Sequence, residues 1–187
     1  MIHNRIDARA VAMLVLLCAI WGLAQVAIKV STAEIPPVLL AAIRSLGAGL
    51  LVLAWSRGAL FQNDGTLAQG VAAGLLFSLE FVVLFRALQL ASASHTVLFL
   101  YTSPVFVAVG THVFVPGERL RRGHVLGLAC AIAGVAIAFA DVLQLPSQRE
   151  VEGDALALLA AVIWAATTVL IKAGRLARID PAKTLFY

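Results

Sequence analysis

Six long apolar stretches constrain this chain more than any other feature, because each is about as long as a membrane-spanning helix. A helix that crosses the hydrocarbon core of a bilayer needs about 20 mostly apolar residues. The connections between the stretches are short and leave no room for a separate water-soluble domain. We therefore expect an all-α, polytopic transmembrane helix bundle, in contact with the lipid bilayer. The expected spans are Ala10–Val30, Pro37–Ser56, Leu67–Leu90, Thr96–Val115, Gly123–Ala140 and Ala155–Lys172, with a seventh beginning near Pro181.

The composition supports the same conclusion and excludes other classes of protein. Of the 187 residues, 61% are hydrophobic and 13% charged, whereas a soluble domain is roughly 45–50% apolar and about 25% charged. A soluble enzyme or a disordered tail is therefore excluded. The positive charges lie between the apolar stretches and not on one basic face, so we expect no nucleic-acid partner. Cys18 and Cys130 lie inside apolar stretches and fit no disulfide framework or metal-binding spacing.

The distribution of basic residues predicts how the chain is oriented in the membrane. With the N-terminus in the cytoplasm, Arg149 is the only lysine or arginine in the outside connections. This asymmetry follows the positive-inside rule and predicts a multi-pass protein of the plasma (inner) membrane. A cleaved signal peptide ending near Ala24 is a weaker alternative, because the apolar run continues past that residue. The nine inside residues are Arg5, Arg9, Arg57, Arg119, Arg121, Arg122, Arg175, Arg178 and Lys183.

An internal repeat links the first and sixth apolar stretches. Ile20-Trp21 and Ile28-Lys29 recur 143 residues later as Ile163-Trp164 and Ile171-Lys172. Five spans separate the starts of the two copies, so the copies cross the membrane in opposite directions. Inverted repeats of this kind form many secondary transporters. We expect a first five-helix repeat at residues 1–145 and a truncated second repeat at residues 151–187.

Several short motifs give the chain a family resemblance. It resembles the EamA-type transporters of the drug/metabolite transporter superfamily, through the order and spacing of all its motifs together. The resemblance implies ten helices in two repeats, alternating access, and transport of small metabolites, amino acids or drugs, with export as the expected direction. It implies no cofactor. The motifs are Ala19-Ile-Trp-Gly22, Phe85-Arg-Ala-Leu88, Ala91-Ser-Ala-Ser94, Ser103-Pro-Val-Phe106, Gly117-Glu-Arg-Leu120, and the segment from Gly127 to Gly134-Val135.

Glu80 is the acidic residue that lies in the middle of a predicted span. At 100° per residue it shares one helix face with small or polar side chains, and such a face is expected to point into the bundle. Glu80 is expected either to bind a proton or a cationic substrate, or to form a fixed ion pair with Arg44. Arg86 is poorly placed for pairing, because it lies about 240° around the helix from Glu80. The predicted inward face comprises Gln69, Ala73, Glu80, Ala87 and Ala91.

The remaining candidate residues for transport lie in the repeated segments and in the fourth span. Lys29 and Lys172 are equivalent in the two copies and are expected either to extend to the lipid headgroups or to act as paired gates. The fourth span contains a proline inside Tyr101-Thr-Ser-Pro104. There we expect a bent helix whose hydroxyls and freed carbonyl near Leu100 either line a substrate site or are satisfied by local packing. Other candidates that would contact the cavity are Trp21, Gln25, Tyr101, Ser103, Pro104 and Trp164.

The function predicted from the sequence is transport of a small-molecule substrate, and the sequence carries no pattern typical of an enzyme. The four histidines form no HExxH motif, and G-x-S-x-G is absent. We expect no metal site. The alternative is a structural or assembly subunit, or a nonfunctional remnant, without transport of its own. If the truncated chain is the real product, a homodimer is expected.

Overall fold

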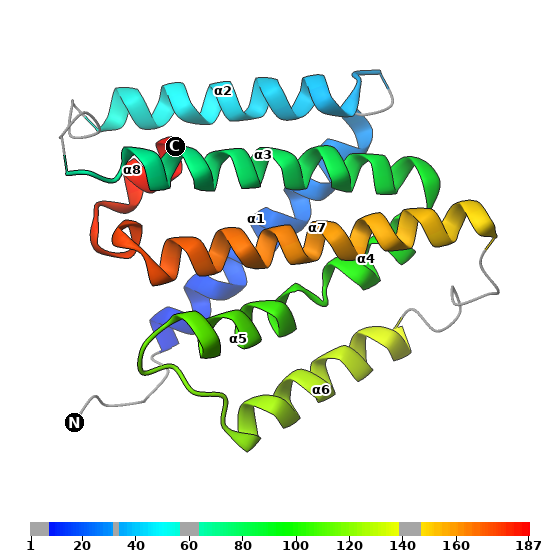
Figure 1. Ribbon diagram of the computed structural model, residues 1–187. Coiled ribbons are helices and arrows are strands. Elements are labelled where there is room, and N and C mark those ends of the chain that lie inside the picture. Colours follow the sequence, from blue (N-terminus) through cyan, green and yellow to red (C-terminus); the bar gives the residue numbers. More distant parts are fainter. Residues whose placement is uncertain (1–7, 32–33, 57–63, 139–146) are drawn as a thin grey trace. The chain divides into compact units, whose positions relative to one another are not determined.

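The computed structural model describes residues 8–31, 34–56, 64–138 and 147–187, and these residues form helices joined by turns, with no strand among them (Figure 1). The predicted all-α fold is confirmed. The α-helices are α1 (Ala8–Ser31), α2 (Pro37–Trp55), α3 (Leu67–Leu90), α4 (Ala93–Leu100), α5 (Ser103–Phe114), α6 (Arg122–Ala138), α7 (Gln148–Ala173) and α8 (Pro181–Phe186). A short 3-10 helix, η3 (Arg175–Arg178), follows α7.

Four helical segments are long and apolar enough to cross a membrane, which makes this a multi-pass membrane protein. They are Val38–Trp55, Leu67–Leu90, Ser94–Phe114 and Gln148–Ala173. Two of the predicted spans correspond to shorter apolar helical stretches, Ala8–Ile20 in α1 and Arg122–Ile137 in α6. The predicted end of the fifth span at Ala140 lies outside the described residues.

The chain forms two compact units, Met1–Ser45 and Leu46–Tyr187. The first contains α1 and the first turns of α2. The second contains α3 to α8 and the candidate site, so the description below concerns this unit alone. The predicted repeat boundary near residue 145 stays a prediction, because this division of the chain does not test it.

Helix α7 is the centre of the second unit and packs against α3, α4 and α5 (Figure 1). Its start is fixed by a capping box, in which Ser147 accepts the Glu150 N–H and Glu150 accepts the Ser147 N–H. Close packing is possible because the inner face of α7 carries alanines. Three alanines spaced four residues apart on this face, Ala157, Ala161 and Ala165, are all buried.

Helices α3 and α7 run antiparallel with their backbones in close approach. A Cβ added to Gly153 would lie 2.6 Å from the Ala91 Cβ, and one added to Gly174 would overlap the Gln69 side chain. The start of α7 therefore meets the end of α3, and the end of α7 meets the start of α3. We call the end of the unit where α3 begins the Asp64 end and the other the Asp154 end.

Helices α4 and α5 run parallel to α7 with a constant offset of 59 residues. The side chain of His95 on α4 contacts Asp154 on α7, and Gly110 on α5 packs against Val169. This offset is the same on both sides of the α4–α5 junction, so both helices keep one register on α7.

The fourth span is broken, which corrects the expected single bent helix. Helix α4 ends at Leu100 and α5 begins at Ser103, so Pro104 is the second residue of a new helix, where its missing N–H is harmless. The break is stabilised locally, because the backbone N–H and the hydroxyl of Thr102 both donate to the Phe99 carbonyl, at 3.1 and 2.6 Å. These two bonds to the Phe99 carbonyl replace regular α-helical bonds, so α4 ends at Leu100, before Pro104.

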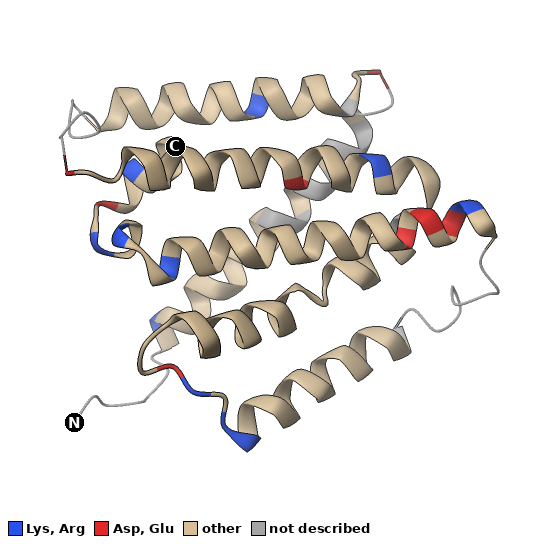
Figure 2. Cartoon of the chain, viewed as in Figure 1, with Lys and Arg blue, Asp and Glu red and all other residues tan. Residues whose placement is uncertain are grey.

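Charged side chains in the second unit lie mainly near helix ends, as expected for a bundle in lipid (Figure 2). Large apolar side chains cover the outer surface of α3, for example Leu75, Leu79 and Val82. The small residues of α6 have no close neighbour in the described residues, since nothing lies within 4 Å of a Cβ added at Gly123 or Gly127.

Candidate functional site

Glu80 lies on the inner face of α3 and is 2% exposed. The predicted inward face is confirmed, because Ala73, Ala87 and Ala91 are also buried. Gln69, at the start of the face, is half-buried and its side chain accepts the Arg175 N–H at 2.8 Å. The helical periodicity of the sequence was sufficient to find this face, because α3 is a regular helix throughout.

Glu80 lies near the middle of the membrane-spanning part of α3. It follows Leu67 by 13 residues and precedes Leu90 by 10. At a rise of about 1.5 Å per residue, the carboxylate lies roughly 20 Å from one end of the helix and about 15 Å from the other. Glu80 is therefore far from both lipid headgroup regions.

The carboxylate of Glu80 has an oxygen with no partner. Among the described residues, nothing hydrogen-bonds to its buried Oε2. Arg86 does not neutralise it, because the Arg86 guanidinium is exposed and donates to the Gln89 Oε1 at 3.1 Å. The Arg44 pair stays a prediction, because Arg44 belongs to the other compact unit.

The α4–α5 break lies at the same depth as Glu80. Interpolation between the contacts of Gly153 with Ala91 and of Gly174 with Gln69 places Glu80 opposite Ile163 and Trp164 of α7. The offset of 59 residues places the break, Tyr101 and Thr102, opposite residues 160 and 161 of the same helix, within one turn of the residues that Glu80 faces. A buried carboxylate and a break in regular backbone thus meet one short segment of α7, at mid-depth.

The side chains at the break have different environments. Ser103 is buried at 8% exposure, whereas Tyr101 is 57% exposed and Pro104 is also exposed. Trp164 follows the segment of α7 that faces the break and is half-buried. The side chains of Trp21, Gln25 and Lys29 lie outside the described residues, so their predicted roles stay predictions.

Lys172 forms an ion pair that the sequence analysis missed. Its Nζ lies 2.6 Å from a carboxylate oxygen of Glu118, in the connection between α5 and α6. Both side chains are more than two-fifths exposed, at 45% and 43%. The expected alternatives for Lys172 were an extension to the lipid headgroups and a role as a gate. Both stay predictions, and in this structure the Lys172 ammonium forms an ion pair with Glu118.

A second missed pair lies at the Asp64 end. Lys183 on α8 donates to the Asp64 Oδ2 at 2.8 Å, while the hydroxyl and backbone N–H of Thr66 donate to Oδ1 at 2.5 and 3.1 Å. These bonds, led by the one from Lys183, lower the pKa of Asp64 to about 2. The same contact raises the pKa of Lys183. The Tyr187 hydroxyl lies 3.2 Å from that of Thr66 and extends the cluster to the end of α8.

The third missed pair is His95 with Asp154, at the Asp154 end. The imidazole Nδ1 lies 3.1 Å from the Asp154 Oδ2, and both residues are buried. No sequence pattern described above paired the two residues. One sequence feature could have suggested the pair. Each residue directly precedes a predicted span, and both spans begin on the same side of the membrane.

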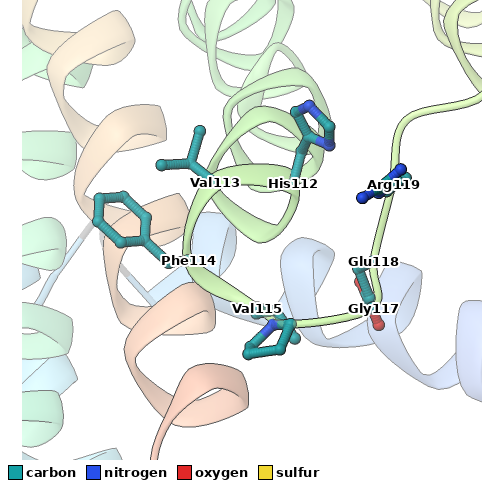
Figure 3. Close-up of a pocket in the computed structure, with 8 residues that line it drawn as sticks. His112, Val113, Phe114, Val115, Gly117, Glu118 and Arg119 are labelled. Atoms are coloured by element: carbon teal, nitrogen blue, oxygen red, sulfur yellow. The ribbon is translucent and has the colours of Figure 1, made fainter.

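Two open surface cavities lie at the Asp64 end, away from Glu80. One, of about 470 Å³, surrounds the α5–α6 connection from His112 to Arg119 (Figure 3). There the His112 Nδ1 accepts the Leu120 N–H at 3.3 Å. The other, of about 580 Å³, is lined by Gln69, Arg175 and Arg178 among others. Across the described part of the chain, no three His, Cys, Asp or Glu side chains lie close enough together to hold a metal ion.

Comparisons with known proteins agree with this architecture. Residues 8–140 match the EamA-like transporter family. An uncharacterized transporter, YoaV, of Bacillus subtilis is 30% identical over 82% of this chain and 53% of its own length. A probable amino-acid metabolite efflux pump of Salmonella typhimurium is 29% identical over 84% of this chain and 51% of its own length. The chain therefore spans about half the length of these relatives.

A solved crystal structure has a similar fold. It superposes with a TM-score of 0.67 at 29% sequence identity, over 83% of this chain and 55% of that one. The computed helix arrangement is thus one that a related chain adopts.

Proposed function

Since most of its length matches the EamA-like transporter family, the chain belongs to that family, and on this premise we propose that it transports small metabolites across the membrane. Membership of a transporter family favours transport over enzymatic activity. Efflux of amino acids or related compounds is the finer proposal, supported by the names of the Salmonella typhimurium relative and of a second from Escherichia coli.

The observation that carries the proposal is the environment of Glu80. An unpaired carboxylate in the bilayer interior costs several kcal/mol and is rare outside functional positions. Glu80 is almost fully buried at mid-depth, and its Oε2 has no partner in the described residues. A group of this kind is stable when it binds a proton or the ammonium group of a substrate. We assign that role to Glu80 in the transport cycle.

The α4–α5 break supports a cavity at the same depth. Non-helical backbone at membrane depth is tolerated where it is buried in protein or lines a water-filled cavity. Tyr101 and Thr102 interrupt the helix within about one turn, along α7, of the residues that Glu80 faces. Alternating access would expose this region first to one side of the membrane and then to the other, with inverted repeats supplying the two halves.

The orientation proposed from the basic residues places the Asp64 end in the cytoplasm. Lys172, Arg175, Arg178 and Lys183 gather around the end of α7 and the start of α3. We propose the plasma (inner) membrane as the location, with the N-terminus in the cytoplasm. The proposed partners are lipid and a small-molecule substrate.

The competing proposal is a chain without transport of its own, either a remnant or an assembly subunit. Measured flux separates the two proposals, and the proposed homodimer is tested by the oligomeric state in the same preparation.

The test is flux of radiolabelled amino acids into vesicles that contain the protein, with and without a pH gradient. We expect flux above that of protein-free vesicles, driven by the gradient in the wild type and in Glu152→Gln. Glu152 is an exposed acid at the start of α7 and serves as the matched control. Glu80→Gln should lose most of the flux or its dependence on pH. Equal pH dependence in Glu80→Gln would contradict the role of Glu80, and no flux from any variant would favour the competing proposal.

A further inference from the structure

The larger of the two cavities at the Asp64 end carries two arginines. It has a volume of about 580 Å³ and lies between the start of α3 and the turn that follows α7. Arg175 and Arg178, both on η3, line it together with Gln69 of α3. Both arginine side chains are exposed. Two guanidinium groups at one cavity are suited to bind the oxygens of a phosphate or a carboxylate.

The turn that carries the arginines is fixed to the start of α3. The Gln69 Oε1 accepts the Arg175 N–H at 2.8 Å, and Gly174 packs directly on the Gln69 side chain. The Nη1 of Arg175 lies 3.0 Å from the position that a Cβ of Gly65 would occupy. Gly65 also has a φ of 70°, so glycine both permits the turn before α3 and leaves room for the guanidinium. The Arg175 side chain therefore lies over this turn, at the cavity.

The two guanidinium groups are not neutralised by neighbouring carboxylates. Among the residues that the structure describes, neither Arg175 nor Arg178 takes part in an ion pair. The nearby acids have other partners, because Asp64 bonds to Lys183 and Asp180 accepts a backbone N–H at the start of α8, at 2.8 Å. Both arginines are thus available to an anionic ligand.

The face of α3 that borders the cavity is apolar and continues toward the middle of the membrane. Ala68 and Ala72 line the cavity itself. Leu75 and Leu79 continue the same face, because all four residues lie within about 60° of one another around the helix. Both leucines are exposed. Small side chains therefore leave room beside the arginines, and large apolar ones follow at the depth of lipid acyl chains.

Helix α7 presents a matching face. Ala173 lines the cavity, and Ala166 and Val162 lie within about 40° of each other on the same side of the helix. All three are exposed. Exposed apolar faces of two membrane-spanning helices thus begin at the cavity. A small soluble anion would contact the arginines alone, whereas a phospholipid would contact the arginines through its phosphate and the two faces through its acyl chains.

We propose that this cavity binds the phosphate of an anionic phospholipid, in the leaflet at the Asp64 end. Arg175 and Arg178 donate to the phosphate oxygens, and the acyl chains lie along the exposed faces of α3 and α7. Basic pockets between transmembrane helices on the cytoplasmic side bind anionic headgroups, and the proposed orientation places the Asp64 end on that side. The bound lipid holds η3 against the start of α3. This binding does not depend on the proposed transport activity.

The test measures whether an anionic lipid stabilises the protein more than a zwitterionic lipid does. The full chain in an uncharged detergent is titrated with phosphatidylglycerol, with phosphatidylcholine of the same chain length, and with glycerol phosphate, which has no acyl chains. A ligand that binds the folded state raises the thermal unfolding midpoint as its concentration increases. We expect phosphatidylglycerol to raise the midpoint most. Equal effects of the two lipids, or equal stabilisation by glycerol phosphate, would overturn the proposal.

Variants at the cavity separate a defined site from diffuse attraction. Because a hydrogen bond to a charged group is strong, Arg175→Gln and Arg178→Gln should each weaken phosphatidylglycerol binding by about tenfold or more. Arg122→Gln removes an equal charge from the exposed start of α6 and is the matched control. It should change binding by less than about twofold at physiological ionic strength, because salt screens a distant charge. Equal weakening by all three substitutions would contradict a defined site.

A second pair of variants blocks the cavity without changing its charge. Ala68→Phe places a ring in the cavity, whereas Leu67→Phe places the same ring at the neighbouring exposed position, which is not among the residues that line it. Both positions are exposed, so we expect both variants to fold. Stabilisation by phosphatidylglycerol should be reduced in Ala68→Phe and retained in Leu67→Phe. Full stabilisation of Ala68→Phe would overturn the assignment of the lipid to this cavity.

Failure of this proposal can be distinguished from failure of the proposed function, because lipid binding is measured without transport. Stabilisation that requires the two arginines, in a protein without flux, would support the lipid site and contradict transport by this chain. Flux in a protein that phosphatidylglycerol does not stabilise would do the opposite.

Discussion

The two ends of the α3–α7 pair hold buried charges in different ways. At the Asp64 end, both carboxylate oxygens of Asp64 are occupied, by Lys183 and by Thr66. At the Asp154 end, one oxygen of Asp154 faces His95 and the other has no partner in the described residues. A carboxylate with both oxygens bonded stabilises its helix contact, whereas a buried oxygen without a hydrogen bond lowers the stability of the contact that contains it. We infer that the bonds around Asp64 hold their end of the pair more firmly than the bond between His95 and Asp154 holds the other end.

The largest effect is expected where the two backbones touch at the Asp154 end. A Cβ at Gly153 would lie 2.7 Å from the Ala91 N and 3.1 Å from the Ala87 carbonyl oxygen, and backbone atoms cannot move aside. Gly153→Val should lower stability by about 1–3 kcal/mol or more, since overpacking forces helices apart. The measurement is the thermal unfolding midpoint in detergent.

The matched control for this substitution is Gly127→Val in α6, where nothing lies within 4 Å of the added Cβ. It should leave the midpoint almost unchanged. Equal destabilisation by both substitutions would mean that α3 and α7 are not in contact at Gly153.

A smaller loss is expected when the pair at the Asp64 end is broken. Lys183 is 4% exposed, so Asp64→Asn leaves its ammonium facing an uncharged amide in a shielded position. The unfolding midpoint should fall by several degrees, whereas Glu34→Gln, at an exposed acid, should change it little. An unchanged unfolding midpoint in Asp64→Asn would show that the Asp64–Lys183 pair does not stabilise the Asp64 end.

The same pair predicts how stability depends on pH. The pKa of Asp64 falls from 3.8 to about 2, so its contribution is complete above the ordinary value and is lost as the pH falls toward 2. The pKa of Lys183 is raised, so its contribution is complete below its ordinary 10.5 and is lost as the pH rises further. Acidification from about pH 4 to 2 should therefore lower the midpoint of the wild type more than that of Asp64→Asn.

The smallest effect is expected at the exposed Lys172–Glu118 pair. Exposed ion pairs contribute about 0.2–1 kcal/mol, and salt screens them. Lys172→Met and Glu118→Gln should each cost this much at low salt, and the double variant should cost no more than either single one. Fully additive costs would show that the 2.6 Å contact does not persist in solution.

The sequence predicted the features that depend on periodicity and missed those that depend on register. The inward face of α3 followed from residues at helical spacing, and burial of Glu80 confirmed it. The pairing of His95 with Asp154 depends on the 59-residue offset between α4 and α7, which tertiary packing fixes. The same is true of Lys172 with Glu118 and of Lys183 with Asp64. Local patterns do not contain these offsets.

The α4–α5 break shows a different limit. The proline at position 104 correctly marked an irregular position, but a proline is compatible both with a bent helix and with the start of a new one. The Thr102 hydroxyl, donating to the Phe99 carbonyl, ends α4 before the proline is reached. Local satisfaction of the hydroxyls was one of the expected alternatives, but the sequence did not show that such a bond would end α4.

Counterflow in vesicles is the most direct test of transport by alternating access. Vesicles that contain the full chain are loaded with an unlabelled amino acid and diluted into a trace of the labelled compound. Our account predicts a transient accumulation of label above its equilibrium level, which Glu80→Gln reduces, because one mid-depth site exchanges substrate with both sides. Label that only equilibrates, at the rate of protein-free vesicles, across a panel of amino acids and related amines would contradict it.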